Sequence, residues 1–254
     1  MPTAPAHDGT RTTFSVRGNG FPLVLSPVRP RGKVAEGYLD RLSDRYQVVL
    51  LDYPGHPKPG SLTPETAAAD VVAVLDEAGI GRFIWFGYSF GSVLGLQLAL
   101  RTDRIAAFVC GGWTPLGAPY ASMVQLSERA ARLTRPVARA TAPLRGRGRP
   151  STDVPAAAPG ASAAQYVTFY RALQDFDEHE ALDALADVPR LVFVGSKDDA
   201  GHSQLASRVA SREHELVSSG WDVRYLEGRR HAVLVRPGVV VPFVRSWLDE
   251  QPLD

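Results

Sequence analysis

The sequence predicts an α/β protein built on a doubly wound, mostly parallel sheet. Seven short stretches have the composition of strands, and several of them are continuous apolar runs bounded by Gly, Pro or Asp, as in a sheet that is buried on both faces. Segments with helical spacing lie between them, and such alternation is typical of a parallel sheet with helices on both faces. The 254 residues fit a single domain spanning 1–254.

The expected strands follow one another along the whole chain. In order they are TTFSV (12–16), PLVLS (22–26), YQVVLLD (46–52), RFIWFG (82–87), IAAFVCGG (105–112), RLVFVG (190–195) and WDVRYLE (221–227). Most are continuous apolar runs rather than alternating ones, so we expect the sheet to lie in the middle of the molecule.

Three helices are predicted from apolar spacing and from their end signals. The segment 61–79 places Val71, Val74 and Leu75 on one side, with Thr63 as N-cap before Pro64 and with Gly79 as the stop. A second helix follows residue 90, with leucines at 94 and 98, and a third closes the chain at GVVVPFVRSWLDE (238–250).

The alternation is interrupted by a helical cap insertion, 114–188, which carries helical patterns and no convincing strand. Within it, 136–160 is rich in Pro, Ala, Gly and Arg, a composition that buries little apolar surface, and we expect a flexible loop there. The RGRGR inside this segment is more typical of a solvated loop than of an RNA contact.

Composition favours a small-molecule partner. The net charge is +1 and the pI is about 7.9, which gives no electrostatic footprint for nucleic acid. Cys110 is the single cysteine, so an internal disulfide framework or a site with several thiolates is excluded, and we expect it to be a buried core residue.

Targeting signals are not apparent in the sequence. The N-terminus lacks a basic start followed by an apolar core, and no run approaches the roughly 18 apolar residues of a membrane span. We therefore expect a cytoplasmic protein without a membrane partner, and the preference for arginine over lysine is typical of a GC-rich bacterial genome.

The stretch GYSFG, residues 87–91, places Ser89 between two glycines. A strand directly precedes Gly87 and a helix directly follows Phe90, which is the setting that a nucleophile elbow requires. Side chains at positions 87 and 91 would collide with neighbouring backbone at such a sharp turn, so glycine is expected at both. The same turn aims the Phe90 N–H toward the place where an oxyanion would form.

A serine hydroxyl needs a base, and that base needs a carboxylate to fix its tautomer. Asp198 and Asp199 follow the strand RLVFVG, and His231 follows the last strand. This chain order of serine, acid and histidine is the one that accompanies the elbow. Either aspartate could instead cap the helix that follows.

From FSVRGNGFPLVL to FVRSWLDE the chain resembles the α/β-hydrolase family, with LDYPGHPKPG in place of the family's DxxGxG loop. The resemblance implies that Ser89 is the nucleophile, His231 the base and later acid, and Asp198 the orienting carboxylate, three residues after a glycine, with Asp199 as the alternative. It implies one oxyanion N–H from Phe90 and no metal or other cofactor.

One departure from the family concerns the second oxyanion donor. Relatives have His-Gly after the strand corresponding to PLVLS, whereas this chain has Ser26, Pro27 and Val28. Proline has no N–H, so the loop must be shaped differently, and we expect the Val28 N–H to donate. Loss of such a donor can cost about 10² to 10³ in turnover.

Other residues are candidates for substrate contact. Tyr88 and Trp113 are expected to line the site; the alternatives are a position in the core for Tyr88 and ordinary packing for Trp113. Aromatic residues in QYVTFYRAL, namely Tyr166, Phe169 and Tyr170, could form an apolar wall or belong to the core. His56 could contact substrate or be a surface residue, and His202 is more typical of a solvated loop than of a metal ligand.

The function predicted from the sequence is a serine hydrolase that cleaves a carboxylic ester or related acyl compound through a Ser-His-Asp triad. The substrate is expected to be a moderately hydrophobic small molecule held under a helical lid. A thioesterase or acyltransferase would use the same triad. A non-hydrolytic catalyst or a ligand-binding protein on this fold is the alternative favoured by the changed oxyanion loop.

Overall fold

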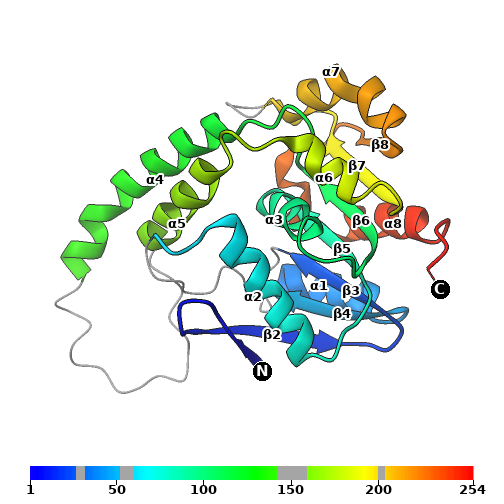
Figure 1. The fold of residues 1–254 in the computed structure, drawn as a ribbon, viewed down its shortest axis with the longest axis horizontal. Coiled ribbons are helices and arrows are strands. Elements are labelled where there is room, and N and C mark those ends of the chain that lie inside the picture. The colour runs from blue at the N-terminus through cyan, green and yellow to red at the C-terminus, as the bar shows by residue number, and fades with distance from the viewer. Residues whose placement is uncertain (27–31, 52–59, 142–158, 200–203, 254) are drawn as a thin grey trace.

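Eight strands form one sheet in the order β1-β2-β4-β3-β5-β6-β7-β8 (Figure 1). The computed structural model describes residues 1–26, 32–51, 60–141, 159–199 and 204–253, and the side chains of all of these except 134–141 and 159–162. The strands are β1 (Thr3–Pro5), β2 (Arg11–Arg17), β3 (Phe21–Ser26), β4 (Tyr46–Leu51), β5 (Phe83–Tyr88), β6 (Ile105–Gly111), β7 (Arg190–Gly195) and β8 (Trp221–Leu226).

The prediction of a mostly parallel sheet is confirmed. From β4 through β8 every neighbouring pair is parallel, whereas β2 pairs antiparallel with β4, and β1 pairs antiparallel with β2. All seven predicted strands occur. The additional strand β1 has three residues, too few to show a period in the sequence.

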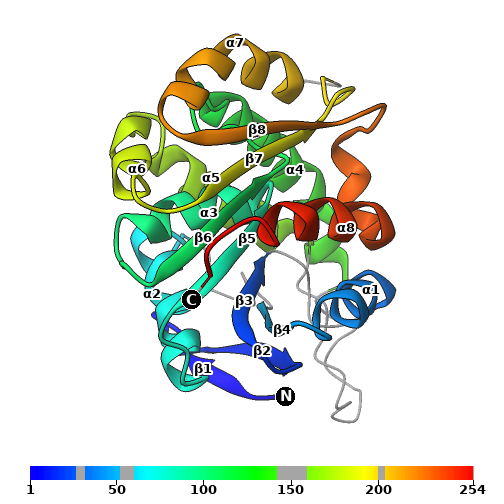
Figure 2. The ribbon, with the colours of Figure 1, turned by 90° about the vertical axis from the view of Figure 1, so that its right-hand side faces the viewer.

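Helices cover both faces of the sheet, as a doubly wound fold requires. On one face, α1 (Lys33–Leu42) and α8 (Pro237–Leu248) share a buried apolar cluster with the strands. On the other, α2 (Pro64–Glu77), α3 (Phe90–Ala99), α6 (Glu178–Ala184) and α7 (Leu205–Ser218) contribute to a second cluster (Figure 2).

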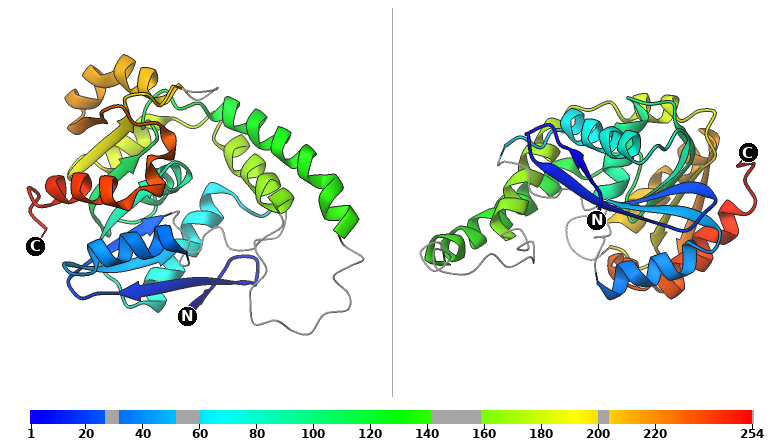
Figure 3. Two further views of the ribbon diagram at one scale, coloured as in Figure 1. Left: turned by 180° about the vertical axis from the view of Figure 1, so that it is seen from behind. Right: turned by 90° about the horizontal axis from the view of Figure 1, so that it is seen from below.

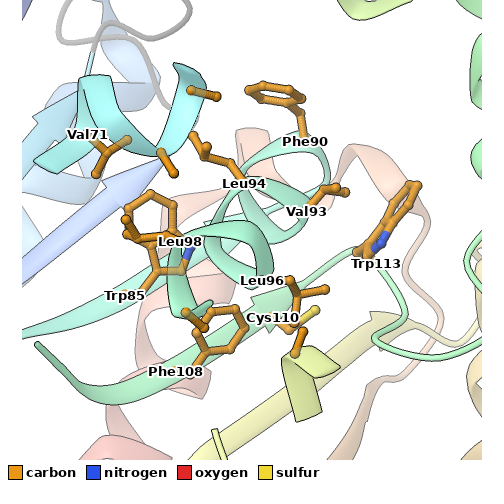
Figure 4. Packing of buried hydrophobic residues seen from close by; sticks show 14 of the residues in the cluster. Val71, Trp85, Phe90, Val93, Leu94, Leu96, Leu98, Phe108, Cys110 and Trp113 are labelled. Atoms are coloured by element: carbon orange, nitrogen blue, oxygen red, sulfur yellow. The ribbon is translucent and has the colours of Figure 1, made fainter. Parts of the chain in front are cut away.

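The core beneath α3 includes Trp85, Leu94, Leu98, Phe108 and Cys110 (Figure 4). Every residue of α3 is buried, so this helix is held by packing on all sides. Cys110 is fully buried as predicted, and burial raises the pKa of its thiol to about 12, which leaves it protonated and unreactive at neutral pH.

The predicted ends of α2 are confirmed. The Thr63 hydroxyl accepts a hydrogen bond from the Thr66 N–H, and the Thr66 hydroxyl accepts one from the Thr63 N–H. This reciprocal pair is a capping box, and Pro64 occupies the first helical position. The helix ends at Glu77, and Gly79 follows with a φ of 66°.

The segment between β6 and β7 is helical and contains α4 (Tyr120–Thr141), α5 (Pro159–Ala172) and α6. Figures 1 and 3 show α4 and α5 side by side, projecting beyond the ends of the strands. Glu128 of α4 accepts a hydrogen bond from Arg171 of α5 at 2.7 Å, which ties the two helices together.

The structure differs from the loop predicted for 136–160 at both of its ends. Helix α4 continues to Thr141 and α5 begins at Pro159, because alanine and arginine are good helix formers and prolong the pattern of the neighbouring helix. The remaining residues of that prediction, 142–158, lie outside the described residues.

The connection into α4 is fastened by a carboxylate. Glu178, at the start of α6, accepts hydrogen bonds from the backbone N–H groups of Gly117 and Ala118, the latter at 2.9 Å. From the other side Arg208 of α7 donates to the Gly117 carbonyl at 2.7 Å. The start of the segment between β6 and β7 is thus held by polar contacts from α6 and α7. Within the described ranges, none of the helices combines the length and apolar character of a membrane span.

Candidate active site

Ser89 lies at the sharp turn between β5 and α3, with a φ of 52° and a ψ of −115°. Residues other than glycine rarely adopt such a backbone conformation, and it persists only where the surrounding structure enforces it. The Ser89 N–H donates to the Gly111 carbonyl at 2.8 Å, and Ser92 donates its hydroxyl to the same oxygen at 2.8 Å. The turn is therefore anchored to the neighbouring strand β6.

Glycine is required at position 87 for a reason that the structure makes visible. A Cβ there would collide with the Gly91 carbonyl and lie 2.6 Å from the Ser92 nitrogen. That carbonyl is itself held in place, because the Trp85 indole N–H donates to it at 3.0 Å. The close approach of helix α3 to β5 thus depends on the missing side chain.

Asp198 lies in the loop that follows β7, three residues after Gly195. A Cβ at Gly195 would collide with the Arg229 carbonyl, so glycine allows the β7 and β8 loops to approach each other. The Lys197 N–H then donates to the Arg229 carbonyl at 2.8 Å. Asp198 itself is 2% exposed, and a carboxylate so deeply buried requires hydrogen-bond partners.

His231 joins these two loops. Its Nδ1 lies 3.0 Å from Asp198 Oδ2, and its Nε2 lies 3.1 Å from Ser89 Oγ. When Nδ1 carries the ring proton, Nδ1–H donates a hydrogen bond to the Asp198 carboxylate, and Nε2 can accept a hydrogen bond from the serine hydroxyl. The structure therefore brings Ser89, Asp198 and His231 into one hydrogen-bonded chain.

Asp199 is not part of the hydrogen-bonded series formed by Ser89, His231 and Asp198. Its carboxylate accepts from the Ser207 N–H at 2.9 Å and from the Ser207 hydroxyl at 2.7 Å, in the first turn of α7. These hydrogen bonds hold the pKa of Asp199 below its ordinary value. Of the two aspartates left open by the sequence, Asp199 is the one that caps the helix, and Asp198 is the one that contacts His231.

Tyr88 does not lie where a substrate contact was predicted. Its side chain is 1% exposed, and its hydroxyl donates to the backbone carbonyl of His231 at 2.7 Å. A Cβ at Gly111 or Gly112 would collide with the Tyr88 ring, so two glycines make room for it. Burial raises the pKa of this phenol, which keeps its proton available for the hydrogen bond. Tyr88 thus supports His231 from behind.

An apolar cavity of about 330 Å³ opens on Ser89. Its walls come from the serine turn and from the facing sides of α4 and α5: Ser89, Phe90, Met123, Leu126, Ser127, Ala130, Ala163, Tyr166 and Tyr170. Tyr166 and Tyr170 line it as the sequence allowed. Phe169 belongs to the core, since it is fully buried with its ring 4.9 Å from that of Phe90.

Trp113 is not among the residues that line this cavity. It is 1% exposed and its ring stacks on that of Tyr170, with centroids 6.2 Å apart and planes at 26°. Trp113 is therefore an ordinary packed residue, which was the alternative to a substrate contact. It supports a cavity wall from outside rather than forming one.

The contribution of α4 was missed in the sequence. Met123, Leu126, Ser127 and Ala130 follow the spacing i, i+3, i+4, i+7, which is one face of a helix. Leu126 is 50% exposed, so this face is apolar without being packed into a core. That pattern is the signal which could have indicated a ligand-facing helix.

Phe90 is the first residue of α3, where backbone N–H groups have no partner within the helix. Its N–H is thus available beside Ser89. Val28, the other expected donor, lies outside the described residues, as do His56 and His202. In the described part of the chain, three or more His, Cys, Asp or Glu side chains are nowhere grouped so that they could hold a metal ion.

The chain is similar to known proteins in sequence and in structure. Residues 18–243 match the model of the alpha/beta hydrolase family. Over 95 residues the chain is 34% identical to a putative carbamate hydrolase RutD of Klebsiella pneumoniae, in a match that covers 35% of this chain and 36% of that protein. The chain thus spans about a third of the length of such curated relatives.

A longer match joins the chain to a segment of a much larger protein. It is 28% identical over 270 residues to the polyketide synthase ThaQ of Burkholderia thailandensis, which covers 95% of this chain and 12% of that protein. Among solved structures, a thermophilic esterase from Thermogutta terrifontis superposes with a TM-score of 0.68 at 19% identity, covering 98% of this chain and 97% of that one.

A second solved structure, from work on carboxylesterases of Nitrososphaera gargenis, has a TM-score of 0.68 at 17% identity and covers 98% of this chain and 100% of that one. At such identities the two superpositions establish the fold alone. Together with the family model, which spans most of the sequence, they confirm the resemblance seen in the sequence: the chain belongs to the alpha/beta hydrolase family.

Proposed function

We propose that this protein is a serine hydrolase that cleaves carboxylic esters of a moderately hydrophobic acid. The observation that carries the proposal is the hydrogen-bonded chain from Ser89 through His231 to Asp198, with distances of 3.1 and 3.0 Å. A serine on a strained turn, a histidine and a buried carboxylate in this order are the parts of an activated nucleophile.

In the first half of the proposed reaction Ser89 Oγ attacks the carbonyl carbon of the ester. His231 Nε2 takes the serine proton as the new C–O bond forms, and Asp198 stabilises the resulting imidazolium. The negative charge on the carbonyl oxygen lies at the N-terminus of α3, where the Phe90 N–H can donate to it. His231 then gives its proton to the leaving group, the bond to that group breaks, and an acyl-enzyme remains.

In the second half a water molecule replaces the leaving group. His231 Nε2 takes a proton from the water, and the oxygen attacks the acyl carbon. When the bond to Ser89 breaks, the serine regains its proton from His231 and the free acid departs. No step requires a metal ion or an organic cofactor.

The cavity between α4 and α5 suggests where the acyl group binds. It is lined mainly by apolar side chains and has a volume of about 330 Å³. Sites for small molecules run from about 300 to 1,000 Å³, so this cavity suits a short or medium acyl chain rather than a long one. The insertion that carries both helices would then act as a lid that keeps water from the acyl-enzyme.

A thioesterase or acyltransferase is the second candidate. The match to a polyketide synthase segment over 95% of this chain favours it, and the same three residues would serve. A thioester differs only in the leaving atom, which His231 would protonate as sulfur instead of oxygen. Esters and thioesters of one acid therefore need to be compared directly.

The test is labelling with a fluorophosphonate, which reacts with activated serines, followed by mass spectrometry of the labelled position. We expect modification of Ser89 alone in the wild type, none in Ser89→Ala, and unchanged labelling in Ser246→Ala, which removes an exposed hydroxyl on α8. A folded wild type that resists even a small probe would overturn the hydrolase proposal and favour a ligand-binding protein on this fold.

A further inference from the structure

A basic hollow lies against the loop that carries His231. It has a volume of about 210 Å³ and is lined by Gly228, Arg229, Arg230, Ala232, Val233 and Arg236. These residues immediately precede and follow the histidine in the chain. The hollow is distinct from the apolar cavity, with which it shares no lining residue.

The side chains of its three arginines, Arg229, Arg230 and Arg236, have no ion pair or hydrogen bond with any part of the chain that the structure describes. Other arginines do have such partners, as Arg104 has in Asp76 at 2.7 Å. Three arginines and no acidic residue line the hollow, so its potential is positive and would attract an anion.

The chemistry of the neighbouring site indicates which part of a substrate would reach the hollow. His231 Nε2 must approach the leaving atom in order to protonate it, just as it approaches Ser89 Oγ at 3.1 Å. With the acyl group in the cavity beside α4 and α5, the leaving group must extend past His231. The histidine side chain is 46% exposed, so a large leaving group has access to it.

We propose that this hollow binds a phosphate group carried on the leaving group of the acyl substrate. The inference rests on the proposed function and adds to it the chemical class of the leaving group. A phosphate monoester bears a charge of about −1.5 to −2 and three acceptor oxygens, which suit several arginine forks, whereas a single carboxylate is satisfied by one. The leaving group departs as the phosphorylated alcohol or thiol after it takes the proton from His231.

The experiment compares substrates that differ only in the phosphate. Butyryl-pantetheine is neutral, and its 4′-phosphate adds one anionic group to the same thioester. Glycerol monobutyrate and its phosphate form the matching pair of oxygen esters. We expect the phosphorylated member of at least one pair to have a kcat/KM about tenfold higher or more, mainly through a lower KM, which is the effect of one charge-assisted hydrogen bond.

Two double variants distinguish an effect of the arginines in the hollow from an effect of the protein's net charge. Arg230→Gln with Arg236→Gln removes two charges from the hollow, and Arg129→Gln with Arg132→Gln removes two charges from exposed positions of α4 that line neither the hollow nor the cavity. The phosphate preference should disappear in the first double variant and persist in the second. It should also fall as ionic strength rises, because the hollow is open to solvent.

Three outcomes distinguish the proposals. A wild type that cleaves p-nitrophenyl butyrate without preferring phosphorylated substrates would overturn the inference and leave the hydrolase proposal standing. Equal loss of preference in both double variants would also overturn it. Failure to cleave any of these substrates, together with an unlabelled Ser89, would remove the proposed function and this inference with it.

Discussion

The hydroxyl of Tyr88 donates to the backbone carbonyl of His231 at 2.7 Å, so the residue before the proposed nucleophile holds the proposed base. The two residues are 143 apart in the sequence. Their contact fixes the His231 loop relative to the serine turn without entering the cavity. A supporting hydrogen bond of this kind sets the orientation of a catalytic side chain.

Tyr88→Phe should therefore slow turnover without abolishing it. Loss of one buried hydrogen bond costs about 1 kcal/mol of unfolding free energy, and misplacement of the histidine should lower kcat several-fold with little change in KM. Tyr38→Phe is the matched control, because Tyr38 donates to the Leu234 carbonyl at 2.9 Å in the same short helix, η2 (His231–Val235). Equal effects of the two variants on kcat would show that Tyr88 acts only on stability.

Asp198→Asn should lower kcat by about 10⁴, because an amide favours the wrong tautomer of His231. Asp199→Asn removes a carboxylate that contacts Ser207, and its effect should be confined to stability. Steady-state kinetics of both variants with the same ester show which aspartate orients His231. If Asp199→Asn proves to be the inactive one, the assignment of the acid is wrong.

Gly87→Ala should disrupt the serine turn. The added methyl group would meet the Gly91 carbonyl, and such crowding in a packed core costs about 1 to 3 kcal/mol. We expect a lower midpoint of urea unfolding and weak labelling of Ser89. Gly81→Ala is the control, since a Cβ at that position has nothing within 4 Å, and it should behave like the wild type. A fully active Gly87→Ala would refute the steric explanation.

The stability of the insertion should depend on the protonation of Glu178. Burial raises the pKa of Glu178, so the folded state holds this proton more tightly than the unfolded state does. The stabilisation is then present below the ordinary glutamate pKa of about 4.3 and is lost as the pH rises through the raised value. The difference in unfolding free energy between wild type and Glu178→Gln, measured across that window, should show the loss.

Asp199 is the control for this prediction, because its contribution to stability should change with pH in the opposite direction. Its hydrogen bonds with Ser207 lower its pKa, so its contribution is present above the ordinary aspartate value and is lost as the pH falls through the lowered one. The difference between wild type and Asp199→Asn should therefore change in the opposite direction with pH. The same sign for both residues would contradict the assignment of burial as the cause at Glu178.

Ala163→Phe should restrict the enzyme to esters of shorter acids. Ala163 lines the apolar cavity from α5, and a phenyl ring would occupy part of its volume of about 330 Å³. The ratio of kcat/KM for octanoate to that for acetate esters of p-nitrophenol should fall about tenfold or more, the effect expected of losing the contacts of one methylene group. Ala121→Phe adds the same ring at an exposed position of α4 and should leave the ratio unchanged.

Much of the site was predictable because its parts are local in the sequence. The strand, turn and helix around Ser89 follow from apolar runs and from two glycines, and these are short-range signals. The order of serine, acid and histidine could likewise be taken from the strands that precede each residue. The choice between Asp198 and Asp199 was different, since the two are adjacent and each follows the same strand.

The surroundings of the site were harder to predict, because they depend on which side chains meet from distant segments. Tyr88 directly precedes Ser89, and Trp113 follows the neighbouring strand β6, yet both side chains are buried behind the site. Met123 and Leu126 appeared only as part of a helical pattern. Nothing in the periodicity of α4 distinguishes a face that packs on a core from one that lines a cavity.

The sequence by itself determined the sheet, the order of its elements and the residue types at the serine turn, because strand periodicity and glycine requirements act over a few neighbouring residues. Only the tertiary structure decided that Asp198 rather than Asp199 reaches His231, that Tyr88 supports the histidine, and that α4 and α5 enclose an apolar cavity over Ser89. These contacts join segments far apart in the chain, and they exist only once the loops at the ends of the strands have been brought together by the packing of the core.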